Sequence, residues 1–194
     1  MSKYEITTEK KKQAIVNAAM ALFTENGFTE VSIKEIAALA HVSQVSLYNY
    51  FGSKEALISE CVDIVMGDTF QKANEILNRD IYFIEKLKLA LSLCTENINL
   101  SVSAYFSKMA LSDPILMNLL TKSINEKKQR IYRDYIETGK QENIIDKTIP
   151  TITYLAFLDS LNVMGSKLEF DDDISTTIGH IHELFLYGLI GKAP

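Results

Sequence analysis

The chain has 194 residues, enough for one or two compact domains and too few for a long repeat array. Hydrophobic residues make up 47% and charged residues 23%, which excludes a disordered chain and a coiled-coil rod. The net charge is −5, yet residues 1–55 hold six lysines and six glutamates, so the remainder holds the whole excess of negative charge. Charge alone therefore neither selects nor excludes a nucleic-acid partner.

Residues that break helices are scarce: the chain has 8 glycines and 3 prolines, which favours long helices. No apolar run approaches about 18 residues, so we expect no membrane span. The lysines near the start precede a periodic stretch without a small-residue cleavage site, so we expect no signal peptide. Cys61 and Cys94 form no CxxC motif and are expected to be buried, reduced thiols.

The first predicted helix runs from about Glu9 to Asn26 and ends at Gly27, with Phe28 packing back on its last turn. Its apolar residues recur at helical spacing and form one stripe: Ile15, Ala18, Ala19, Leu22 and Phe23.

A second, shorter helix begins after Ser32, because Ser32 and Glu35 have the spacing of a capping box. It covers about eight residues and leads to a short turn at His41 and Val42. Ser43 then caps a third helix, from Gln44 to about Tyr50. The residues predicted to face inward from this helix are Val45 and Tyr48, with Phe51 as a third candidate.

Two short helices joined by a tight turn are typical of a helix-turn-helix module. The compact polar residues of the second of these helices suit base edges in a major groove: Ser43, Gln44, Ser46 and Asn49. Three further side chains could reach backbone phosphates: Tyr48, Tyr50 and Lys54. The alternative is a three-helix module whose polar face is simply solvated.

From Ser53 onward the sequence predicts only helices, with breaks near residues 78–80, 99–101, 113–114, 139–150 and 167–173. Asp113 is predicted to cap a long helix that starts at Pro114 and ends at Gly139. Two more helices are expected at about 150–166 and 174–190. The predicted fold is therefore all-α, with about nine helices.

Residues 10–58 resemble the DNA-binding domain of the TetR family of bacterial transcriptional regulators. The matching positions, all in register with the family pattern, are Ala18-Ala19, Leu22-Phe23, Gly27, Ser32, Ile36-Ala37, Ala40, Val42-Ser43, Leu47-Tyr48, Tyr50-Phe51, Lys54 and Leu57. The resemblance implies a helix-turn-helix domain at residues 1–52 and a helical effector-binding and dimerisation domain at residues 53–194. It also implies that Ser32 lies against a phosphate at a helix N-terminus.

Three features depart from the family pattern. His41 stands at the turn where the pattern usually has glycine, and Val45 stands where a small residue is common. No arginine precedes Arg79, so this module lacks the bidentate arginine–guanine contact. Base selection would then depend on Gln, Ser and Asn side chains or on DNA shape. The candidate phosphate-binding charges are Lys10, Lys11, Lys12, Lys34 and Lys54.

The resemblance further implies a four-helix dimer interface formed by the last two helices of each subunit. The candidate interface residues are Leu155, Leu158, Ile178, Ile181 and Phe185. An effector pocket is expected within residues 60–165. Its candidate lining residues are Met66, Phe70, Cys94, Tyr105, Phe106, Met109, Tyr154, Asp159 and Asn162. The alternatives are a monomer and side chains that belong to an ordinary core.

The resemblance therefore implies a cytoplasmic repressor that binds a palindromic operator as a homodimer and is released by a small-molecule effector, with no cofactor and no metal. An activator and a ligand-free repressor remain open. An adaptor whose N-terminal module no longer reads DNA is the alternative class. Catalysis is not expected, because the chain has three histidines and none of the motifs GxSxG, HExxH, GxGxxG or a Walker loop.

Overall fold

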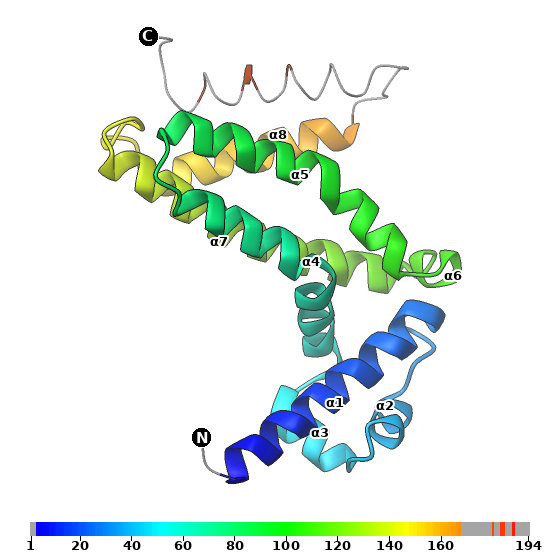
Figure 1. Ribbon diagram of the computed structural model, residues 1–194. Coiled ribbons are helices and arrows are strands. Elements are labelled where there is room, and N and C mark those ends of the chain that lie inside the picture. The colour runs from blue at the N-terminus through cyan, green and yellow to red at the C-terminus, as the bar shows by residue number, and fades with distance from the viewer. Residues whose placement is uncertain (1–2, 168–179, 181–182, 185–187, 189–194) are drawn as a thin grey trace. The chain divides into compact units, whose positions relative to one another are not determined.

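A computed structural model describes residues 3–167 and, beyond them, residues 180, 183, 184 and 188. The described residues form eight α-helices and no strand, which confirms the all-α prediction (Figure 1). None of these helices is both long enough and apolar enough to cross a membrane. The expected helix at about 174–190 falls almost wholly outside the described residues. The helices are α1 (Lys3–Asn26), α2 (Ile33–Leu39), α3 (Gln44–Phe51), α4 (Lys54–Leu77), α5 (Phe83–Tyr105), α6 (Lys108–Leu111), α7 (Pro114–Gln141) and α8 (Thr151–Lys167).

The chain divides into two compact units. Unit 1 comprises residues 1–68 and 98–126, and unit 2 comprises residues 69–97 and 127–194. The long helices α4, α5 and α7 each contribute one part to unit 1 and the other part to unit 2.

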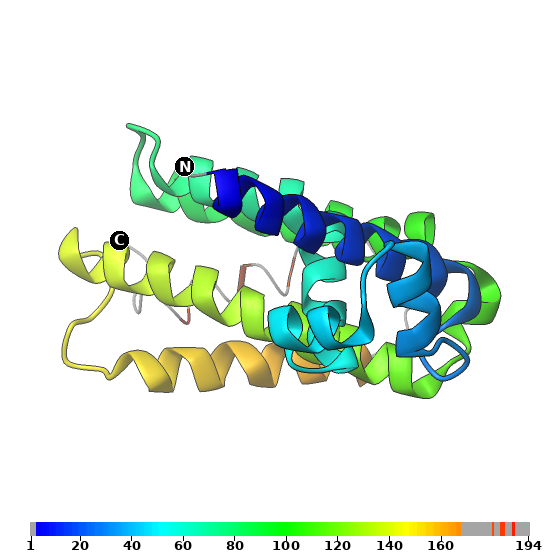
Figure 2. The same cartoon turned by 90° about the horizontal axis from the view of Figure 1, so that it is seen from below.

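Unit 1 is organised around α1, which contacts α2, α3 and α6. Helices α2 and α3 also contact each other and lie side by side in the view from below (Figure 2). The predicted stripe on α1 supplies much of the core, since Ile15, Ala19 and Phe23 are fully buried. The end of α1 is as expected: Gly27 adopts a φ of 78°, and the rings of Phe23 and Phe28 lie 5.6 Å apart between centroids.

Unit 2 has its own hydrophobic core, to which α5, α7 and α8 contribute. The Tyr135 hydroxyl donates a hydrogen bond of 2.7 Å to the carbonyl oxygen of Ala73, so its one polar atom is satisfied inside this core. The buried residues of the core are Phe83, Leu87, Tyr135, Ile136, Ile145, Tyr154, Leu155 and Leu158.

The predicted break near residues 99–101 is wrong. Helix α5 continues through it to Tyr105, and the chain leaves the helix at Phe106 and Ser107. Asn and Ser have low helix propensity but do not stop a helix that lacks Gly and Pro. The Ser107 hydroxyl then caps α6 by accepting the backbone N–H of Ala110 at 3.0 Å.

The predicted helix end at Gly139 is also wrong, because α7 continues to Gln141. Gly139 has a packing role instead: a Cβ atom there would lie 2.6 Å from Cζ of Phe83 and 2.7 Å from Cδ1 of Ile145. Asn143 takes the left-handed conformation that follows the helix, with a φ of 59°.

Candidate nucleic-acid interface

The capping box that starts α2 is present as predicted. The Ser32 hydroxyl oxygen accepts the backbone N–H of Glu35 at 3.2 Å, and the Glu35 carboxylate accepts the backbone N–H of Ser32 at 2.7 Å. The Ser32 hydroxyl and backbone hydrogen bonds lower the pKa of Glu35. A phosphate placed at Ser32 would therefore have to approach an ionised carboxylate, which weakens the expected phosphate role of Ser32.

The turn between α2 and α3 passes through His41 in the left-handed region, with a φ of 54°. The backbone N–H of Val42 closes the turn by donating to the carbonyl oxygen of Ala37 at 3.0 Å. This is the position where the sequence pattern usually has glycine, so the departure at His41 places a side chain in a conformation that L-residues rarely adopt.

The predicted inward face of α3 is wrong. Leu47 is the fully buried residue of this helix, whereas Val45 and Tyr48 are 68% and 49% exposed. Because an α-helix turns about 100° per residue, Val45 lies about 200° from Leu47 and faces the opposite side. Phe51, one turn after Leu47, is half-buried and follows the same buried face.

The outward side of α3 carries Gln44, Val45, Tyr48 and Asn49, which we call the α3 face; all four residues are exposed. The sequence between Glu35 and Lys54 contains no formally charged residue, so this face is uncharged and combines two amides and a tyrosine with the aliphatic side chain of Val45. Within the described part of the chain, neither the Gln44 nor the Asn49 side-chain amide makes a hydrogen bond, so both can still donate and accept.

Ser43 and Ser46 have a local role at the start of α3. The Ser43 hydroxyl oxygen accepts the backbone N–H of Ser46 at 3.1 Å, and the two hydroxyl oxygens lie 2.9 Å apart. This pair caps the helix. The two hydroxyl groups therefore have fewer hydrogen bonds left to make with DNA bases than the sequence predicts.

Lys54 is held inside unit 1. Its ammonium donates a hydrogen bond of 2.5 Å to the carbonyl oxygen of Phe28 and lies 4.0 Å from the centroid of the Phe28 ring. Burial is the largest influence on its pKa, which is lowered. An ammonium held in this way is a poorer phosphate ligand than an exposed lysine such as Lys34, so the structure weakens the expected phosphate contact of Lys54.

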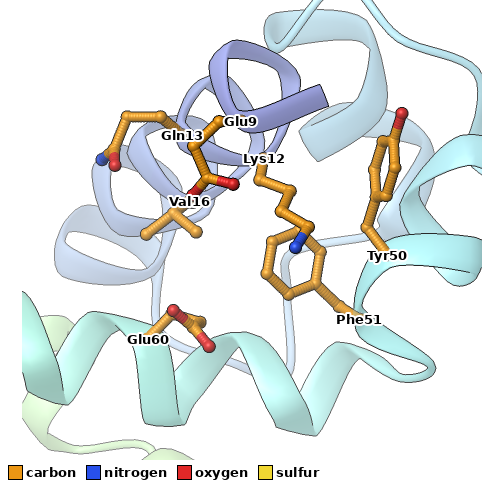
Figure 3. Close-up of a pocket in the computed structure, with 7 residues that line it drawn as sticks. All are labelled: Glu9, Lys12, Gln13, Val16, Tyr50, Phe51 and Glu60. Carbon is orange, nitrogen blue, oxygen red and sulfur yellow. The ribbon is translucent and has the colours of Figure 1, made fainter. Parts of the chain in front are cut away.

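Tyr50, another predicted phosphate contact, is half-buried at the edge of a pocket of about 200 Å³ in unit 1 (Figure 3). In the close-up, the Lys12 side chain extends from α1 toward the ring of Phe51. None of the candidate effector residues lines this pocket. Its lining residues are Glu9, Lys12, Gln13, Val16, Tyr50, Phe51 and Glu60.

The turn between α1 and α2 is fixed by Asp113, at the start of α7. One carboxylate oxygen accepts the backbone N–H groups of Phe28 and Thr29 at 2.8 and 2.6 Å. The other accepts those of Ile115 and Leu116 at 2.9 and 3.2 Å, which confirms the predicted cap. Burial acts to raise the pKa of Asp113, but its hydrogen bonds with Thr29, Leu116 and Ile115 together lower it to about 2.

The end of α1 is also held by hydrogen bonds from Ser107, a residue distant in sequence. Ser107 donates its backbone N–H to the carbonyl oxygen of Thr24 and its hydroxyl to that of Glu25, both at 2.8 Å. Two of the last carbonyls of α1, those of Thr24 and Glu25, thereby gain partners that the helix itself does not supply.

The candidate effector residues of unit 1 differ in burial. Met66 and Phe106 are buried, whereas Tyr105 and Met109 are 49% and 59% exposed. Tyr105 and Met109 therefore lie at the surface of unit 1. Residues that line an enclosed pocket would be less exposed than this.

The candidate effector residues of unit 2 also differ from the expectation. Asp159 was expected to orient a ligand within an apolar helix, but it is exposed, and both its carboxylate oxygens accept from the Gln129 side-chain amide at 2.6 Å. Phe70 is half-buried, and Tyr154 is buried with its hydroxyl donating to the Asp146 carbonyl oxygen at 3.3 Å. The side chains of Cys94 and Asn162 lie outside the described part of the structure.

The structure corrects the prediction that Leu155 and Leu158 form part of a dimer interface. Leu155 and Leu158 are 1% and 6% exposed and belong to the core of unit 2, because α8 packs this face on its own chain. Their buried side chains are not available to a second subunit. The other three candidates, Ile178, Ile181 and Phe185, lie outside the described residues.

Residues 15–61 match the family model described as "Bacterial regulatory proteins, tetR family". This match covers the second half of α1, all of α2 and α3, and the start of α4, so it includes the elements that build and position the α3 face.

Two curated relatives are transcriptional regulators. The chain is 26% identical over 193 residues to the HTH-type transcriptional regulator RutR of Escherichia coli (strain K12), covering 92% of this chain and 90% of that protein. It is 28% identical over 146 residues to the uncharacterized HTH-type transcriptional regulator YerO of Bacillus subtilis (strain 168), covering 64% of this chain but only half of that protein.

The fold is similar to that of the transcriptional regulator FadR from Bacillus subtilis, whose crystal structure contains stearoyl-CoA. The TM-score is 0.52 at 19% sequence identity, with 92% of this chain and 99% of that chain covered.

Proposed function

Because this chain is a transcriptional regulator of the tetR family and not an enzyme, we propose that it represses transcription in the bacterial cytoplasm by binding a palindromic operator as a homodimer. A small-molecule effector releases it from that operator. Residues 1–52 read the DNA, and residues 53–194 hold the effector and the second subunit. No cofactor takes part.

The observation that carries this proposal is the α3 face. It lies on the second helix of a helix-turn-helix, where the side chains that enter a major groove are found. Gln44 and Asn49 present free amides there, and a Gln or Asn amide can pair with N6 and N7 of adenine. The Tyr48 hydroxyl can reach the sugar–phosphate backbone beside them.

Few positively charged side chains of unit 1 are available to bind the DNA phosphates. Exposed lysines of unit 1 include Lys10, Lys11 and Lys34, while Lys12 and Lys54 are partly buried. With so few phosphate contacts per subunit, one module binds weakly, and a dimer that engages two half-sites supplies the missing free energy. A two-fold symmetric protein then requires a palindromic site.

The direct test selects sheared genomic DNA from the source organism on the purified full-length chain at about 100 mM salt, followed by sequencing. The expected result is a palindrome whose half-sites are spaced by about one helical turn. Gln44→Ala should relax the selected base at one symmetric pair of positions, whereas Lys34→Ala should weaken binding to all sequences alike. A folded protein that retains no sequence above background would contradict the proposal and favour the adaptor.

The effector is tested through linkage. A compound that raises the melting temperature of the free protein and prefers the DNA-free state must lower operator affinity, and the operator must lower the affinity for that compound by the same factor. A library screen by thermal shift identifies the compounds, and a gel-shift titration measures the coupling. If every compound that stabilises the protein leaves its operator affinity unchanged, the proposed release by an effector is contradicted.

A further inference from the structure

We infer that Val45 is a base-reading residue that packs against the C5-methyl group of a thymine in each half-site. This inference rests on the proposed function and adds to it a specificity determinant at a residue that the sequence pattern predicts to face the protein interior. It follows from the rotation of α3, from the local absence of charge and from the chemistry of the neighbouring Gln44.

The rotation of α3 places Val45 outside the domain. Leu47 is fully buried and sets the inward direction, and Val45, two positions earlier, is 68% exposed. Val45 is the second residue of α3, within the N-terminal turn that contacts base edges in helix-turn-helix proteins. A branched aliphatic side chain at this place is largely exposed and does not belong to the buried core of its domain.

The surroundings of Val45 favour an apolar contact over a charged one. No formally charged residue occurs between Glu35 and Lys54, so no arginine or lysine of α3 competes for the same base pair. The hydroxyl groups of Ser43 and Ser46, on either side, are engaged with each other in the helix cap. The groove edge that Val45 reaches is therefore contacted by two methyl groups and by the amide of Gln44.

An A·T pair presents the matching chemistry. Its major-groove edge carries N6 and N7 of adenine, which suit a glutamine amide, and the methyl group of thymine, which suits an aliphatic side chain. Gln44 and Val45 are adjacent on the exposed side of α3, so one A·T pair or two neighbouring pairs can satisfy both. The operator half-site is accordingly expected to have a thymine at the position of Val45.

The test removes only the methyl group. Each thymine of the selected operator is replaced in turn, symmetrically in both half-sites, by deoxyuridine, and binding of the full-length dimer is measured at fixed salt. At one position the wild type should lose about fourfold in affinity per methyl group removed, as expected for one buried carbon. Val45→Ala should bind the thymine and deoxyuridine duplexes at that position equally, while its melting temperature stays that of the wild type.

Leu39→Ala is the matched control, because Leu39 is an exposed aliphatic residue at 51% on α2, outside the α3 face. It should keep the full difference between thymine and deoxyuridine. The inference is overturned if the wild type binds its operator without any methyl dependence, or if Val45→Ala retains that dependence; the proposed function survives both results. Failure of the folded wild type to select any sequence overturns the proposed function and this inference together.

Discussion

The carboxylate of Asp113 accepts the backbone N–H of Thr29 at 2.6 Å, across 84 positions of sequence. The same side chain caps α7, so one residue joins the first turn of α7 to the turn that precedes α2. Gly27 permits this close approach, because a Cβ atom there would lie 3.0 Å from Oδ2 of Asp113. The entry to the helix-turn-helix is thus positioned by a residue far from it in sequence.

Replacing Asp113 by alanine should destabilise the protein by about 2–4 kcal/mol, since the cap of α7 and the acceptors for Phe28 and Thr29 are lost together. Urea unfolding followed by circular dichroism measures this change. Asp134→Ala, on the exposed side of the same helix, is the control and should stay within about 0.5 kcal/mol of the wild type. Equal effects of the two substitutions would show that the Asp113 contacts contribute nothing specific.

Acid should remove the contribution of Asp113. Its pKa is about 2 in the folded protein against 3.8 for the free side chain, so the folded state binds this proton more weakly than the unfolded chain does. The stabilisation is therefore complete above about pH 4 and is lost as the pH falls toward 2. The difference in unfolding free energy between the wild type and Asp113→Asn should shrink across that window, because all other carboxylates are common to both. A difference that does not change with pH would contradict the lowered pKa.

Local patterns predicted the parts of the fold that depend on neighbours in sequence. The capping box of Ser32 and Glu35, the stop at Gly27 and the cap by Asp113 each need only residues within a few positions, and all three are present. The family resemblance was carried by the same short-range spacing. The sequence could not reveal that Asp113 has a second set of partners, because Phe28 and Thr29 are brought to it by tertiary packing alone.

The errors at the site have the same origin. An eight-residue helix offers several apolar residues, and periodicity alone could not decide whether Val45 and Tyr48 or Leu47 faces the core. The contact of Lys54 with Phe28 could not be predicted either, because a lysine that follows a helix-turn-helix is expected to be solvated or to bind a phosphate. The leucine at position 47 was among the residues that carried the family resemblance, and that signal was the one that could have corrected the rotation of α3.

Lys54→Met should lower stability by about 1–2 kcal/mol, because it deletes the hydrogen bond to the Phe28 carbonyl and the contact of the ammonium with the Phe28 ring. Thermal unfolding measures this loss. Lys34→Met, at an exposed position on α2, should leave the melting temperature unchanged and should instead reduce the salt dependence of DNA binding. If the Lys54→Met protein is as stable as the wild type, the contact with Phe28 contributes nothing, and the phosphate contact predicted from the sequence is favoured again.

Two glycines inside helices should respond to alanine in opposite directions. At Gly139, a Cβ atom would lie 2.6 Å from Cζ of Phe83 and 2.7 Å from Cδ1 of Ile145, both in the core of unit 2. Overpacking of this kind costs about 1–3 kcal/mol, and it outweighs the gain in helix propensity. Gly139→Ala should therefore destabilise the protein in urea unfolding.

At Gly67, in α4, a Cβ atom would meet nothing within 4 Å, so only the propensity term remains. Gly67→Ala should accordingly stabilise the protein by about 0.5–1 kcal/mol. The pair separates packing from propensity, because both substitutions add the same methyl group to a helix interior. If both alanines stabilised the protein alike, the close approach of Phe83 to α7 would be refuted, and Gly139 would carry no more than the cost of an ordinary helical glycine.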